Sequence, residues 1–490
     1  MKRKSKLIFL ALFILLTTVT LGSCNLNLSD QECVHEWNEG EIIEQGDCHT
    51  PGLIRRECSK CGATDEKNAI LIEHIEGDWI IDKEATCIDG SKHTECAVCG
   101  ATVSTETILA TTEEHEYENY NCVNCGLTSV ECFEFDDFGD SWGILAKDIN
   151  NMPSEIVIPS TYEGKAVDGI CENAFYGCAN LTSVVIPDSV TSIGNSAFYG
   201  CANLTSVDMP DSVTFIGINA FYTCTHLTKV DIPNSVTAIH DGAFSACVRL
   251  ASLEIPDSVT YIGKLAFAGC HSITNVVIPD SVTYIGDYAF RACDILASVV
   301  IGNGVKHIRE GVFDSCTSLT SVVMPDGITK IDKYAFRYCK SLASVDIPDS
   351  VTFIGDEVFY YCESLTNVVI PNSVTTVYWG LFENCTSLSS VVIGNSVSYI
   401  DIRAFLSCSS LTDVVISNSV TSIGQAAFAS CLNLNNVYYD GTEEEWNTIT
   451  INSNNSYLKN ATRYYYSEEA PTTEGNFWHW GENGEVEVWN

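Results

Sequence analysis

The sequence predicts a repeat solenoid built mainly from short β-strands, and two regular spacings are the reason. Cysteine recurs every 23 residues from Cys178 to Cys431, and a phenylalanine stands three residues before each of these twelve cysteines. Repetition at such a period is typical of stacked coils, in which one coil cannot bury its own apolar side chains and neighbouring coils bury them together. We therefore expect residues 154–437 to form about 12–13 coils.

Each coil is expected to contain two short segments and one tight turn. Leu181, Val184 and Ile186 place apolar side chains on one face of a first parallel strand. Pro187 ends that strand, because proline has no N–H to donate. A second inward-facing segment follows, and an Ala-Phe-x-x-Cys sequence closes the coil with a tight helical turn. An incomplete copy precedes the first full coil, interrupted by an insertion at 162–165.

The complete unit, AFxxCxxLxxVxIPxSVxxIG, resembles the 23-residue leucine-rich repeat of BspA-like surface proteins. The resemblance covers more than half of the chain, and nearly every consensus position is filled. It implies a right-handed leucine-rich-repeat stack of parallel strands, exposed on a bacterial surface. Some relatives are credited with adhesion to host proteins. The departures are mild, since only single residues differ: Gly302, Gly394 and Ser417 replace proline, and Ile273 replaces leucine.

The first 23 residues have the layout of a secretory signal. Four basic residues precede an apolar run at 7–16, and Leu-Gly-Ser-Cys, which resembles a bacterial lipobox, ends at Cys24. The apolar run is short for a membrane crossing, so cleavage is favoured over an uncleaved membrane helix. We expect Cys24 to be lipidated and to anchor the chain to the outer face of the cell membrane, with 24–32 as a linker.

Residues 33–132 are predicted to be a stalk of small Cys-rich modules, because a Cys-x-x-Cys-Gly sequence recurs three times in them. The segment resembles the Cys-rich spacer repeats of gut-bacterial surface proteins. Thiolates two residues apart suit neighbouring corners of a zinc tetrahedron, and structural zinc would stabilise modules with such small cores. Disulfides are the alternative, because exported chains often contain them. The expected zinc ligands form three sets: His35, Cys48, Cys58 and Cys61; His74, Cys87, Cys96 and Cys99; and His115, Cys122, Cys125 and Cys132.

The twelve repeat cysteines have two interpretations. A column of thiols could be a redox array, or each cysteine could be a small buried residue whose S–H makes a weak hydrogen bond. In-register stacking keeps the Cβ vectors parallel, whereas a disulfide needs them to converge. We therefore expect free, buried thiols.

Outward positions of the repeats predict two candidate ligand-binding columns. In the first strand, the residue between the inward Val and Ile is acidic in three consecutive coils, at Asp208, Asp231 and Glu254, and is mostly valine elsewhere. The carboxylates could bind a cation or a basic protein segment, with Lys229 answering part of their charge, or they could form a solvated acidic face. The valines form an apolar stripe suited to protein contact.

The second column lies in the second segment of each coil and is aromatic. It contains five rings that would stack outward and suit contact with protein or carbohydrate, although aromatic residues also simply favour strand surfaces. These residues are Phe215, Tyr261, Tyr284, Phe353 and Tyr399.

Both ends of the array are expected to be capped, since an open core end must be covered. Residues 133–153 are a linker or N-terminal cap, and 438–467 are a C-terminal cap in which Thr442 and Glu445 form a capping box. A final strand is expected near 463–466. Residues 468–490 form a Trp-rich tail, where Asn-Gly predicts a tight hairpin.

These features together predict a binding protein. The net charge of −39 repels phosphate backbones, so nucleic acid is not expected as a partner. No nucleophile, histidine and acid constellation and no phosphate loop is evident, so we do not expect an enzyme or any cofactor besides zinc. The predicted function is adhesion to an extracellular protein or glycan of a host or neighbouring cell. The alternative is a structural or spacer component of the cell envelope that binds nothing.

Overall fold

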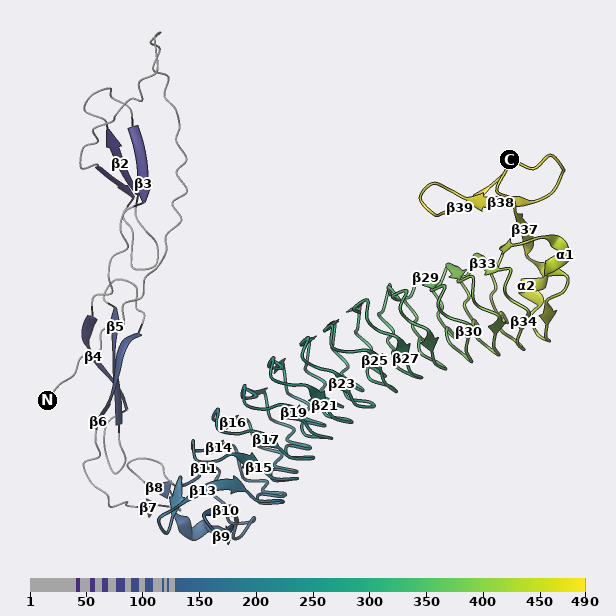
Figure 1. Ribbon diagram of the computed structural model, residues 1–490. Coiled ribbons are helices and arrows are strands. Elements are labelled where there is room, and N and C mark those ends of the chain that lie inside the picture. The colour runs from purple at the N-terminus through teal and green to yellow at the C-terminus, as the bar shows by residue number, and fades with distance from the viewer. Residues whose placement is uncertain are drawn as a thin grey trace, which may run out of the picture. The chain divides into compact units, whose positions relative to one another are not determined.

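The computed structural model describes residues 128–489 fully and the backbone of eight short strands before them (Figure 1). Strands β1, β2 and β3 form one antiparallel sheet, β4, β5 and β6 form a second, and β7 pairs with β8. Two segments of the predicted stalk therefore each contain a three-stranded sheet. The bounds are β1 (Glu41–Glu44), β2 (Leu53–Glu57), β3 (Thr64–Asn68), β4 (Glu76–Lys83), β5 (Gly90–Cys96), β6 (Thr102–Ile108), β7 (Tyr117–Glu118) and β8 (Asn121–Cys122).

The repeats form a solenoid of parallel strands, which confirms the predicted fold class (Figure 1). The sequence period sets the register, because each residue pairs with the residue 23 positions later, as Val184 does with Val207. The first strands of the coils are β11 (Glu155–Val157), β14 (Ser183–Val185), β16 (Ser206–Asp208), β18 (Lys229–Val230), β20 (Ser252–Leu253), β22 (Asn275–Ile278), β24 (Ser298–Ile301), β26 (Ser321–Val323), β29 (Asn367–Ile370), β31 (Ser390–Ile393), β33 (Asp413–Ser417) and β35 (Asn436–Asp440).

The second segment of each coil is also a short parallel strand, and Ile193 pairs with Ile216 in the same register. These strands are β13 (Lys165–Ile170), β15 (Ser192–Ile193), β17 (Phe215–Ile216), β19 (Ala238–Ile239), β21 (Tyr261–Ile262), β23 (Tyr284–Ile285), β25 (His307–Ile308), β27 (Lys330–Ile331), β28 (Phe353–Ile354), β30 (Thr376–Val377), β32 (Tyr399–Ile400), β34 (Ser422–Ile423) and β36 (Thr450–Ile451).

A ladder of stacked phenylalanines runs through the core from Phe175 to Phe428. All of these rings are fully buried. Successive ring centroids lie 5.0–5.8 Å apart, and the interplanar angles are 2–18°. Each ring between Phe175 and Phe428 is covered by the rings of the coils before and after it, so no coil buries its core alone.

The repeat cysteines are free and buried, as predicted. Eleven of them, from Cys201 to Cys431, donate their S–H to the backbone oxygen of the phenylalanine 26 residues earlier, at 3.1–3.4 Å. This hydrogen bond joins each coil to the preceding one. The cysteine is therefore a small core residue that also links neighbouring coils.

The tight turn that closes each coil is built from successive hydrogen-bonded turns, where a helical turn was expected. In the first full coil, the Cys178 N–H donates to the Phe175 oxygen, and Gly177 between them has a φ of +71°. Such left-handed residues interrupt any helix, which is why the chain reverses so sharply here. Helix among the described residues is limited to η1 (Val130–Cys132), α1 (Glu443–Trp446) and α2 (Ser456–Asn460).

The segment at 133–146 forms the first layer of the array. Strands β9 (Phe133–Asp137) and β10 (Ser141–Ala146) form an antiparallel hairpin, and β10 pairs in parallel with β13. Phe133 contacts Phe175 edge-on at 6.4 Å, so it extends the core ladder. The insertion at 162–165 forms the turn between β12 (Thr161–Tyr162) and β13.

The other end of the array is closed by α1, α2 and strand β37 (Thr462–Tyr466), which pairs with β35. Thr442 and Glu445 make both hydrogen bonds of the predicted capping box. The tail then forms the predicted hairpin, of β38 (Phe477–Trp480) and β39 (Val486–Val488), with Gly484 at a φ of +77°. No helix among residues that can be described is long and apolar enough to cross a membrane.

Candidate binding surface

The outward residues of the first strands form a strip along the solenoid, which we call the outer column. Its members from Val185 to Val369 are all exposed, and Val277 and Val369 each keep 62 % of their surface exposed. In-register pairing stacks neighbouring members at the strand spacing of about 4.8 Å within β11–β14–β16, β18–β20, β22–β24–β26 and β29–β31–β33–β35. The chemistry of the column changes from coil to coil.

The acidic part of the outer column contains Asp208, Asp231 and Glu254, exposed as predicted. The Lys229 Nζ lies 2.7 Å from Oδ2 of Asp231, so the expected ion pair is present. Asp231, Glu254 and Asp257 line a shallow depression of about 330 Å³. In the part of the chain that the structure describes, no group of three or more His, Cys, Asp or Glu residues is arranged to hold a metal ion.

The valine part of the outer column begins in the next coil. Val277, Val300 and Val323 line a groove of about 560 Å³, with Asp257 and Asp280 also in its lining. Gly302 lies between the corner prolines of the coils on either side, so no proline ring fills its position. Asp257 lines both the groove and the acidic depression, which makes the two hollows neighbours.

The tail covers the last part of the outer column, which the sequence pattern placed on the exposed stripe. Val415 and Tyr438 are only 5 % and 9 % exposed, because they pack against the fully buried Trp478 of β38. Trp478 also donates its Nε1–H to the Tyr439 oxygen at 2.9 Å. The expectation of an open stripe is therefore wrong at this end.

The aromatic column is less exposed than expected. Phe215 is exposed, and Tyr261, Tyr284, Phe353 and Tyr399 are half-buried. Rings in this column shield one another, since Tyr261 and Tyr284 stack at 4.8 Å. Phe353 instead packs near Tyr378 at 5.1 Å, and the Tyr399 hydroxyl donates to Asp401.

Two further side chains, which the sequence pattern did not identify, contact the rings of this aromatic column. His240 occupies a position where most repeats have glycine, and its ring lies 4.9 Å from Phe215 and 6.3 Å from Tyr261. The guanidinium of Arg309 lies 4.3 Å from the centre of the Tyr284 ring. Both residues replace the glycine of the repeat consensus, and this replacement could have identified them from the sequence.

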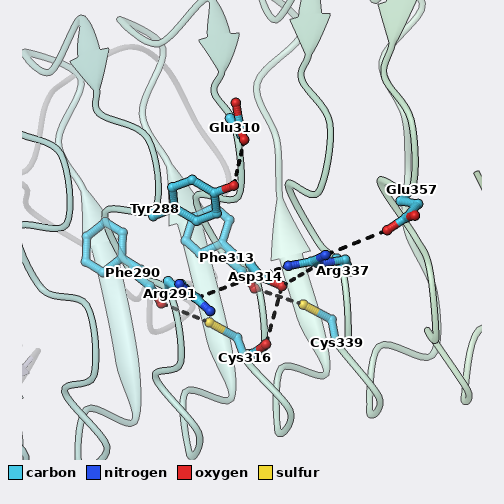
Figure 2. Close-up of polar contacts among 11 residues, drawn as sticks. Tyr288, Phe290, Arg291, Glu310, Phe313, Asp314, Cys316, Arg337, Cys339 and Glu357 are labelled. Atoms are coloured by element: carbon cyan, nitrogen blue, oxygen red, sulfur yellow. Dashed lines mark hydrogen bonds and ion pairs between the residues drawn. The ribbon is translucent and has the colours of Figure 1, made fainter.

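A third column, which the sequence analysis also missed, consists of the residues directly after each core phenylalanine. Tyr176, Tyr199 and Tyr222 stack in it at 4.6 and 4.8 Å. Further along, Figure 2 shows Arg291 and Arg337 approaching Asp314 from the coils on either side. These twelve residues follow the same 23-residue period, so the sequence could have identified this column as it did the other two.

Asp314 is fully buried, and its charge is answered by several groups. Arg337 donates to both of its carboxylate oxygens, at 3.0 and 3.1 Å, and Arg291 Nε lies 3.3 Å away (Figure 2). Glu357 lies 3.7 Å from Arg337. Since a buried carboxylate without partners is very unfavourable, the arginines of the two neighbouring coils stabilise Asp314 in the folded chain.

The comparisons with known proteins agree with this architecture. A family model described as a BspA-type leucine-rich repeat region in six copies matches residues 168–293, 237–362 and 329–459. The chain belongs to the BspA-type leucine-rich repeat family. The matched residues cover coils that carry the phenylalanine ladder and the cysteine column, so the resemblance found in the repeat consensus is confirmed.

Several solved structures are similar to this leucine-rich repeat chain, and no curated protein matches it. A leucine-rich cell surface protein from Faecalibacterium prausnitzii is 31 % identical over 65 % of this chain and 96 % of its own, with a TM-score of 0.46. A leucine-rich repeat protein from Bacteroides ovatus is 24 % identical over 66 % and 97 %, with a TM-score of 0.43. The leucine-rich repeat protein of T. pallidum is 30 % identical over 44 % and 90 %, with a TM-score of 0.34.

The remaining predicted sites lie almost wholly outside the described residues. These are the lipidation site at Cys24 and the side chains of eleven of the twelve expected zinc ligands. Cys132 is the exception, and it is buried in the solenoid core, where its S–H donates to the Ser129 oxygen. Burial raises the pKa of the Cys132 thiol to about 11.

Proposed function

We propose that this protein is an extracytoplasmic, membrane-anchored binding protein that adheres to proteins or glycans of a host or neighbouring cell. The observation that supports the proposal most is the outer column, where carboxylates and valines stay exposed on a rigid array although core packing does not use them. Contiguous exposed apolar surface in a soluble fold marks an interaction site. A leucine-rich repeat array suits a scaffold for contact better than an enzyme.

The surface location is supported by the secretory signal and the lipobox at Cys24. One similar solved structure, from F. prausnitzii, is described as a cell surface protein. Expression of the chain with radiolabelled palmitate should label it, and Cys24→Ala should remove the label and release the protein from the membrane. Unchanged membrane retention of the Cys24→Ala variant would contradict a lipid anchor.

Binding is tested with the purified full chain on arrays of extracellular-matrix proteins and mucin glycans. Saturable binding to at least one component is expected. Substitutions on the outer column should weaken this binding, whereas Lys340→Met, at an exposed residue outside that column, should not. If nothing binds saturably, the spacer function is the correct one.

Structural zinc in the Cys-x-x-Cys-Gly modules is a separate proposal. It is supported by the spacing of the cysteines and by one histidine before each pair. Cys132 is the weakest of the twelve candidates, because a zinc ligand must be a thiolate and burial favours its protonated form. Metal analysis of the purified chain should find zinc. Absence of both metal and free thiols in these modules would favour disulfides.

A further inference from the structure

The groove at Val277, Val300 and Val323 is the longest run of consecutive exposed valines in the outer column. These valines keep 62, 40 and 56 % of their surface exposed. Their neighbours in the strand, such as Val276 and Ile278, lie on the opposite face and are buried. Leaving three stacked valines in water has an unfavourable solvation energy that the fold itself does not require. The groove therefore suits an apolar occupant.

The chain's own tail indicates what kind of group fits against such valines. At the covered end of the same column, Val415 packs against Trp478, which comes from a β-strand and is completely buried. Val369 is 62 % exposed, Val392 is half-buried and Val415 is 5 % exposed, so the cover begins within a second run of valines, which the exposed Asp346 separates from the groove. An aromatic side chain carried by an extended segment is thus already accepted by this column.

Charge distinguishes the occupant of the groove from the tail. Asp257 and Asp280 line the groove, and Asp231 and Glu254 lie in the adjoining depression. The Asp280 carboxylate accepts hydrogen bonds from Asn303, which lower its pKa and keep it ionised. Lys306 donates its Nζ–H to the Asn303 backbone oxygen at 2.9 Å, and no Lys or Arg is among the residues that line the groove.

A second copy of this chain fits the groove poorly. Its tail has no Lys or Arg from residue 468 onward, and Glu482, Glu485 and Glu487 lie in the hairpin. Bringing that hairpin to the acidic lining would set like charges beside one another. The occupant that the charges favour is a cationic one.

We propose that the Val277–Val300–Val323 groove docks an extended basic peptide segment of a partner protein, with an aromatic side chain on the valines and Lys or Arg side chains on Asp257, Asp280 and Glu254. This inference rests on the proposed binding function and names the partner chemistry of the same surface. Charge steers such a segment to the acidic lining, and burial of the aromatic ring holds it there.

The test uses the full chain and three synthetic twelve-residue peptides: one alternating Lys and Trp, one with Glu in place of Lys, and one with Ser in place of Trp. Saturable binding is expected only for the Lys–Trp peptide, and it should weaken as salt increases. Equal binding of the Glu–Trp peptide, or of the Lys–Ser peptide, would overturn the proposal.

Matched variants locate the binding. Replacing Val277, Val300 and Val323 by Ser should weaken the Lys–Trp peptide by about tenfold or more. Replacing Val185 and Val369, equally exposed valines of the same column outside the groove, should change it less than about twofold. Asp280→Asn should also weaken binding, while Asp188→Asn at the same repeat position should not. Asn372 shows that asparagine can make the same backbone contact, since its Oδ1 accepts from the Asn395 N–H.

Other outcomes separate this inference from the proposed function. If a matrix protein or glycan binds the chain but the triple valine variant binds it equally well, the groove proposal fails and the binding function stands. If no matrix component binds but the peptide results hold, the adhesion function fails and the groove proposal stands. If the chain self-associates in sedimentation and the triple valine variant does not, a second copy is the occupant and the groove proposal is overturned.

Discussion

Two regions of the outer column have valine at the same repeat position but differ in what surrounds it. Val277, Val300 and Val323 in the central coils face solvent, whereas Val415 near the C-terminus is covered by Trp478. The strand geometry is the same at both places, because each valine pairs in register with the coil 23 residues away. Repetition thus produces identical surfaces, and only an added segment at one end turns such a surface into core.

Both regions have the same column of buried cysteines in their core, so alkaline pH should destabilise both of them. Burial raises the pKa of Cys224 and of Cys431 to about 12, compared with an ordinary value of 9.0. The folded state binds these protons more tightly, so the stabilisation is complete below pH 9 and is lost as pH rises from 9 towards 12. In that window, each such thiol lowers the free energy of unfolding by about 1.4 kcal/mol per pH unit.

With many thiols in the column, cooperative unfolding is expected above about pH 10, as measured by circular dichroism. A Cys224→Ala variant should show a shallower dependence, which separates thiol ionisation from tyrosine ionisation. Equal stability at neutral pH and at pH 11 would contradict the role of the column.

Removing the Trp478 side chain should expose Val415 and Tyr438, as Val277 is exposed in the central coils. Trp478→Ala deletes a fully buried indole and its hydrogen bond to Tyr439, and should weaken docking of the tail by about 3–5 kcal/mol. Hydrogen exchange of β35 and β37 should then become faster. Trp480→Ala, at a 38 % exposed residue of the same strand, is the control and should have a much smaller effect. Unchanged exchange in the Trp478 variant would mean that the tail does not stabilise this end.

The open central coils have another source of stability, on their turn side. Arg337→Met leaves the buried Asp314 with Arg291 and the Ser315 hydroxyl, and should lower the free energy of unfolding by about 3 kcal/mol. Urea unfolding measures this change. Lys340→Met, in the same coil as Arg337, removes an exposed ion pair with Glu363 of the next coil; it is the control and should have little effect. Equal effects of the two substitutions would rule out a special role for the buried network.

Truncating an open valine should have the smallest effect. Val277→Ala should change the free energy of unfolding by less than about 0.5 kcal/mol, because the side chain contributes little to the core. Val415→Ala, by contrast, should cost about 1–2 kcal/mol, since Val415 lies under Trp478. Thermal unfolding of the two variants measures the difference. A large loss for Val277→Ala would mean that the open stripe is already covered.

Regular positions were the ones that could be predicted from the sequence. The 23-residue period identified the coils, the buried phenylalanines, the free thiols and the outward column, because a repeated pattern must give repeated surroundings. The capping box at Thr442 and the tail hairpin also followed from local sequence, since their hydrogen bonds join residues close in the chain. The acidic row and its ion pair with Lys229 were identified in the same way.

Contacts that cross coils without repeating were decided only by the tertiary structure. The burial of Val415 depends on a tryptophan 63 residues later in the chain, and the pairing of Asp314 depends on arginines in two other coils. Periodicity shows which residues share a column, but not which side chains in that column reach one another or which are covered by a segment outside the repeats. The sequence by itself therefore determined the array and its faces. The folded chain decided which stretch of those faces stays open, because burial is a property of the neighbours that a residue acquires in space.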